Sequence, residues 1–224
     1  LYQRCMGVLL DDLGRRVGAL GLYSALLGQP SDVRVVLGAS GNLARWRVFD
    51  TQAAVLPSAD EPLRVDPFLV AWILGERAAM VRDPRVRRTM RLSIWPGASL
   101  MDAEEERSRA DTLIDMLQGA HDGQWLLFAG GDSPGWRALL ELGARIRQCS
   151  PIRVEAARIA SLDSVELEEC GTRLGRAVRG TGAPLVIDVT NVATTAEADE
   201  ALQLFFGAVA ASGCRVAVIC TDAA

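Results

Sequence analysis

The chain has 224 residues, half of them apolar, and a net charge of −4, which fits one large or two modest domains with packed cores. All 24 basic residues are arginine, which excludes Schiff-base chemistry and the lysine of a phosphate-binding loop. The single histidine, His121, argues against Ser-His-Asp catalysis and multi-histidine metal sites. No apolar run approaches the roughly 20 residues of a membrane-spanning helix.

The five cysteines stand in apolar surroundings and form no CxxC pair, so we expect reduced, buried thiols without chemistry. The sequence shows no signal peptide, and this favours a cytoplasmic protein. Because it starts at Leu1, we expect a piece of a longer chain.

Charge predicts two modules, since residues 1–100 carry a net +4 and residues 101–224 a net −8. The break falls at Pro96-Gly97, before an acidic run at 102–106 that is typical of a linker or a helix start. We therefore expect a winged-helix (α+β) domain over 1–98 and an α/β module over 99–224.

The first module combines helices with a small hairpin, an arrangement typical of winged helices. We expect helices over 2–13, 15–28 and 31–38, a strand over 43–49 that pairs with 63–65, and a helix from Asp66-Pro67 to Gly75.

A run of arginines follows: Arg82, Arg85, Arg87, Arg88 and Arg91. Such a run predicts either phosphate contacts to nucleic acid or an ordinary solvated helix face. The acidic overall charge and the lack of a basic arm leave DNA binding the lesser interpretation.

The second module alternates strands and helices, which predicts a parallel sheet with helices packed on its faces. The expected strands span 125–129, 152–154, 184–188 and 216–219, and the expected helices span 136–148, 164–178 and 197–211.

A glycine-rich turn follows the first of these strands, at the sheet edge where ligands bind. Gly130, Gly131 and Gly135 reproduce the Gly-x-x-x-x-Gly frame of a phosphate-binding loop. The next two positions normally hold Lys and a metal-binding Ser or Thr, but here they are Trp136 and Arg137.

The third strand ends at Asp188, the place of the acid that holds Mg²⁺ in phosphate-loop enzymes. A turn or helix cap is the alternative interpretation of Asp188. Val189 follows where a water-activating glutamate would stand, so hydrolysis by this module is not expected.

Residues 63–75 (LRVDPFLVAWILG), followed by Asp83-Pro84-Arg85, resemble a recurring signature of bacterial AAA+ ATPases of the cell-division-control-48-like group. Leu1-Tyr2, Leu10-Asp11-Asp12 and residues 43–46 fit the same N-terminal pattern. In this family a winged-helix domain precedes the ATPase modules, and the first module is commonly decayed and followed by an intact one.

The resemblance implies a hexameric, ATP-driven remodelling or unfolding machine, with ATP and Mg²⁺ bound by the parent protein and weakly or not at all by this chain. It also implies as partners a C-terminal AAA+ module of the same protein, further copies of the chain, and a protein substrate or adaptor. Gly130 and Gly135 match the Walker A glycines, Asp188 the Walker B aspartate and Thr221 the sensor-1 position. The Walker A lysine, the Walker B glutamate and the helical lid have no match.

We therefore expect a degenerate, P-loop-like αβα module that does not hydrolyse ATP and serves as a scaffold, an oligomer contact or a docking site. One alternative is a regulatory module with a residual nucleotide site, in which Arg137 supplies the missing charge. Another is a winged-helix DNA-binding regulator. An enzyme with unrelated chemistry has no convincing nucleophile motif to support it.

Overall fold

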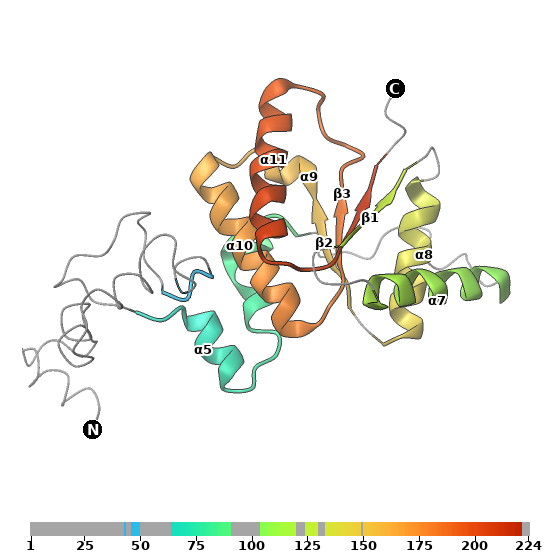
Figure 1. Ribbon diagram of the computed structural model, residues 1–224, viewed down its shortest axis with the longest axis horizontal. Helices are drawn as coiled ribbons and strands as arrows, with labels where there is room; N and C mark the ends of the chain where they lie inside the picture. Colours follow the sequence, from blue (N-terminus) through green and yellow to red (C-terminus); the bar gives the residue numbers. More distant parts are fainter. Residues whose placement is uncertain are drawn as a thin grey trace, which may run out of the picture. The chain divides into compact units, whose positions relative to one another are not determined.

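The structure, a computed structural model, describes residues 43, 46–49, 64–90, 104–119, 124–129, 133–148 and 150–220 (Figure 1). The chain divides into two units, Leu1–Ala79 and Met80–Ala224. Within the described ranges, no helix is long and apolar enough to cross a membrane.

The first unit contains α5 (Pro67–Ile73), which begins where the sequence predicts. The Asp66 carboxylate caps the helix by accepting the backbone N–H groups of Phe68 at 2.8 Å and Leu69 at 3.2 Å. Proline at the first helical position loses no hydrogen bond, because that N–H has no partner within the helix.

One antiparallel bridge joins Phe49 to Val65, at the place predicted for a hairpin. The predicted strand over 43–49 is wrong for most of its described residues: Leu43 is helical, Trp46 and Arg47 form a turn, and only Phe49 forms a β-bridge. The helices predicted over 2–38 lie outside the described residues. The winged-helix domain therefore stays a prediction.

The second unit alternates helices and short strands. In chain order its elements are η1 (Met80–Arg82), α6 (Pro84–Arg87), α7 (Glu104–Gly119), β1 (Trp125–Phe128), α8 (Ser133–Ile146), β2 (Ile152–Glu155), α9 (Ala156–Ile159), α10 (Ser164–Thr181), β3 (Leu185–Asp188), α11 (Ala196–Ala211) and β4 (Val216–Ile219).

The four described strands form one parallel sheet in the order β1-β4-β3-β2. This confirms the predicted α/β fold with a parallel sheet. Because the strands are parallel and in register, Phe128 at the end of β1 and Asp188 at the end of β3 lie at the same carboxyl edge of the sheet, on either side of Ile219 of β4. Asp188 is in register with Ile219 of β4 and with Glu155 of β2.

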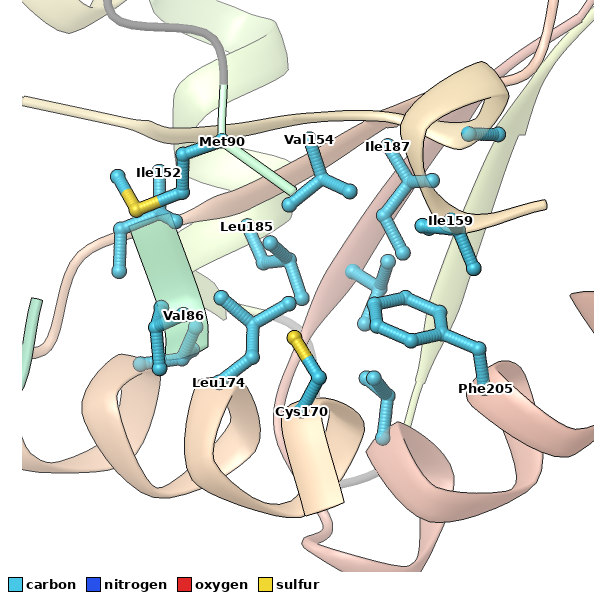
Figure 2. Close-up of a cluster of buried hydrophobic side chains, with 14 of the residues drawn as sticks. Val86, Met90, Ile152, Val154, Ile159, Cys170, Leu174, Leu185, Ile187 and Phe205 are labelled. Atoms are coloured by element: carbon cyan, nitrogen blue, oxygen red, sulfur yellow. The ribbon is translucent and has the colours of Figure 1, made fainter. Parts of the chain in front are cut away.

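Helices pack on both faces of the sheet. On one face, α6, α9, α10 and α11 bury a large apolar cluster that includes Leu174 and Phe205 (Figure 2). On the other face, α7 and α8 pack with Phe128, Val186 and Ile219 in a smaller cluster (Figure 1). Both faces of β3 and β4 are thus covered, and all eight of their residues are buried.

Residues 80–90 belong to the second unit, where η1 and α6 pack against α10. The predicted boundary between residues 98 and 99 lies outside the described residues and stays a prediction. The described part of the acidic run, Glu104 to Glu106, forms the first turn of α7, which agrees with the prediction that the run starts a helix.

Candidate functional site

The candidate site lies at the carboxyl edge of the sheet, where β3 ends at Asp188. The Asp188 side chain is only 4 % exposed. A carboxylate that is removed from water in this way needs a cation or several hydrogen-bond donors to remain ionised. What surrounds Asp188 therefore determines what the site can bind.

Arg137, in the first turns of α8, supplies that cation. Its Nε donates to Oδ2 of Asp188 at 2.7 Å, and its Nη2 donates to Oδ1 at 3.0 Å. The two parallel hydrogen bonds match the planar fork of a guanidinium to the two oxygens of a carboxylate. Because the Arg137 side chain is itself only 18 % exposed, water screens this ion pair poorly.

Thr190 closes the arrangement. Its hydroxyl accepts a hydrogen bond from Nη2 of Arg137 and donates one to Oδ1 of Asp188 at 2.7 Å. The backbone N–H of Thr190 also donates to Oδ1, at 3.1 Å. Asp188 therefore caps the turn after β3. This agrees with the alternative interpretation of Asp188 as a turn or helix cap.

The electrostatics of Asp188 combine opposing effects. Burial by itself raises the pKa of Asp188, but the hydrogen bonds from Arg137 and Thr190 and the positive charge of Arg137 outweigh it. The pKa lies below the ordinary value of 3.8, so Asp188 is ionised at neutral pH.

Trp136, at the position where a phosphate-binding loop carries lysine, is partly buried and packs against apolar side chains. Its ring lies 5.2 Å from that of Phe128, centroid to centroid, at an interplanar angle of 47°. It contacts the apolar cluster under α7 and α8. A bulky indole in that position offers no charge to a phosphate group, and its packing gives it a structural role.

The described residues do not fit a magnesium nucleotide. The guanidinium of Arg137 lies on the carboxylate that would hold the metal or its water, and a second cation at that point would be repelled. Among the described residues, no group of three His, Cys, Asp or Glu side chains could hold a metal ion.

The remaining predicted nucleotide-site residues divide into two groups. Gly135 is buried in the first turn of α8. Gly130, Gly131 and Thr221 lie outside the described residues. Sequence reasoning missed Thr190, although a hydroxyl two residues after a strand-ending aspartate is a common signal for a side-chain-capped turn.

The predicted nucleic-acid surface is partly neutralised. Arg85 contacts Asp83 at 3.1 Å and Glu169 at 3.3 Å, and Arg88 contacts Glu166 at 2.8 Å. Of the other arginines, Arg82 ends η1, Arg87 ends α6, and Arg91 lies outside the described residues. DNA binding stays a prediction. The ion pairs of Arg85 and Arg88 with glutamates leave less positive charge for contacts to phosphate groups than the arginine run suggests.

A comparison of the chain with protein-family descriptions and with curated proteins found no match.

Proposed function

We propose that the second unit is a P-loop-like α/β module that has lost nucleotide hydrolysis and serves as a structural and docking part of an AAA+-type protein. One observation carries this proposal: the Arg137 guanidinium forms a bidentate ion pair with Asp188, at the point where the resemblance would place Mg²⁺. The guanidinium of Arg137, a cation of the chain itself, thus neutralises the Asp188 carboxylate.

Hydrolysis of a nucleotide needs positive charge on the phosphates, an acid that holds the metal, and a group that orients the attacking water. Trp136 packs against Phe128 and supplies no charge. Asp188 is engaged by Arg137 and Thr190. Val189, where the resemblance would place the water-activating glutamate, packs against the larger apolar cluster.

Both altered positions of the loop have partners within the fold. Arg137 joins α8 to the end of β3, and Trp136 joins α8 to β1. In a nucleotide-binding module, the ligand and its metal join these same elements. This chain achieves that connection with side chains, so we propose that its sheet edge keeps one arrangement whether nucleotide is present or absent.

A module of this kind contributes a surface on which other proteins, or other parts of the same protein, dock. By the family resemblance, its partners are a C-terminal AAA+ module of the same protein, further copies of the chain in a hexamer, and a protein substrate or adaptor. ATP turnover then belongs to the parent protein and its intact module.

The test restores the two missing groups in the variant Trp136→Lys/Arg137→Thr. If the frame is that of a phosphate-binding loop, calorimetric titration of this variant shows Mg²⁺-dependent ATP binding at least tenfold tighter than that of the unmodified chain. Arg145→Thr, an exposed change on the same helix, is the matched control and leaves ATP binding unchanged. Equal affinities for all three proteins, with the fold intact by circular dichroism, would refute the P-loop-like interpretation.

A further inference from the structure

β2 is an outermost strand of the described sheet. One edge of β2 pairs with β3, and its other edge faces away from the sheet. The backbone N–H and C=O groups along the other edge of such a strand are a template for pairing with another chain. What lies against that edge therefore decides whether the module can associate through its sheet.

Residues 80–90, called the strap from here on, lie against this edge. Met90 forms an antiparallel bridge with Val154, and the backbone N–H of Glu155 donates to the carbonyl of Thr89 at 3.1 Å. Figure 2 shows the Met90 side chain beside Ile152 and Val154, and Met90 is only 7 % exposed. Thr89 and Met90 thus cover the Val154–Glu155 part of the backbone edge, and Met90 also covers the apolar side chains next to it.

Buried contacts hold the middle of the strap. Val86 is completely buried in the large apolar cluster. Asp83 pairs with Arg173 of α10 at 3.2 Å, and both side chains are 1 % exposed. The Asp83 carboxylate also accepts the backbone N–H of Arg85 at 2.9 Å, which fixes the start of α6.

More exposed ion pairs hold its outer side. Arg85 and Arg88 reach Glu169 and Glu166, both on α10, at 3.3 and 2.8 Å. Each pair of this kind contributes little by itself and is screened by salt, but reversing one of its charges replaces attraction with repulsion. The arginine run that resembles a phosphate-binding face thus has an intramolecular role in joining the strap to α10.

We propose that the strap caps the β2 edge and keeps it from pairing with the β2 edge of a second copy of this chain. The antiparallel bridge at Val154 shows that this edge accepts an antiparallel neighbour. Two copies related by a twofold axis would present their β2 edges to each other in that same antiparallel sense. While the strap lies on this edge, the β2 edge of a second copy cannot pair with it.

The first test compares Val86→Ser/Met90→Ser with the matched control Arg87→Ser, which changes an exposed residue of the same strap. Light scattering gives the mass over a range of concentrations, and hydrogen exchange follows the Glu155 amide, which the strap protects, with the Ile152 amide, hydrogen-bonded to Pro184, as an internal reference. We expect a new, concentration-dependent dimer for the double variant, with fast exchange of the Glu155 amide when it is diluted. The control should match the unmodified chain. A folded double variant with unchanged mass and unchanged exchange would overturn the proposal.

Because that double variant removes two core side chains, a second set leaves the core intact. Arg88→Glu opposes Glu166 of α10, and adding Glu166→Arg restores opposite charges, whereas Arg85 and Glu169, which also contact the buried Asp83 and Arg173, stay unchanged. Trypsin cuts this lysine-free chain only after arginine, so cleavage after Arg85, whose following residue Val86 is unchanged in this set, reports release of the strap. We expect several-fold faster cleavage and the new dimer in the first variant, and reversal of both in the charge-swapped one. Equal cleavage rates and equal masses in all three proteins would overturn the proposal.

Discussion

Replacing Arg137 with methionine tests the internal ion pair most sharply, because it keeps much of the side-chain length and removes the charge. Asp188, whose side chain is 4 % exposed in the unmodified chain, then keeps only the two hydrogen bonds from Thr190. Removing one partner of a buried ion pair costs about 3–5 kcal/mol, and the partial exposure of Arg137 places this case near the lower end, at about 3 kcal/mol. At roughly 2–4 °C per kcal/mol for a chain of this size, the melting temperature falls by about 6–12 °C.

The assay is urea unfolding, since guanidinium chloride would screen the ion pair under study. The double-mutant cycle adds Asp188→Asn alone and combined with Arg137→Met, so that the coupling between the two side chains is isolated. We expect a coupling of about 2 kcal/mol or more at pH 7. A coupling below about 0.5 kcal/mol would refute the view that Arg137 is the cation on which Asp188 depends.

The pH dependence gives an independent check. The folded-state pKa of Asp188 lies below the ordinary value of 3.8, so this carboxylate adds stability above pH 4, and that stability is lost as pH falls through the folded pKa. In Arg137→Met, burial acts with less opposition and the pKa of Asp188 rises. The difference in free energy of unfolding between the unmodified chain and Arg137→Met should therefore become smaller as pH falls from about 5 to about 3. A constant gap would contradict this reasoning.

Three further predictions concern the interior of the second unit. Glu141→Gln should cost about 3 kcal/mol in urea unfolding because it removes the carboxylate 3.0 Å from Arg153, whereas Glu141→Leu/Arg153→Met should cost clearly less; equal losses would contradict a buried ion pair. Burial raises the pKa of the Cys170 thiol to about 11, so iodoacetamide at pH 8 should modify it only after unfolding, and rapid labelling of the native chain would exclude this. Gly143→Ala should lower the melting temperature by several degrees because its Cβ would meet the backbone of α7, at a cost of about 2 kcal/mol. The control Gly207→Ala, whose Cβ meets nothing within 4 Å, should be neutral or stabilising, and similar melting temperatures for the two variants would show that α7 and α8 do not approach closely.

The sheet was predictable because its strands are short apolar runs, and such runs are typical of strands buried on both faces. The predicted strand over 216–219 coincides with β4, and the predicted strand over 184–188 contains β3. The helix start at Asp66-Pro67 was predictable as well, since a cap and a proline at the first position are purely local signals.

The contacts that define the site were less predictable. The alternation of strands and helices predicts Arg137 and Asp188 at the same edge of a parallel sheet, but 51 residues separate them and no local pattern shows that they pair. The strap has the same difficulty, because Arg85 meets Glu169 across 84 residues. By itself, the arginine run is compatible with a solvated face, a phosphate surface or an intramolecular ion-pair set. Only the packing of α6 against α10 identifies the contacts that two of its members make.

The most direct measurement is calorimetric titration of the unmodified chain with ATP, with and without Mg²⁺. If Arg137 permanently takes the place of the metal at Asp188, the titration shows no Mg²⁺-dependent binding at high micromolar protein. Micromolar binding that strengthens on addition of Mg²⁺ would contradict the account, because it would require the carboxylate to leave its guanidinium for a metal ion.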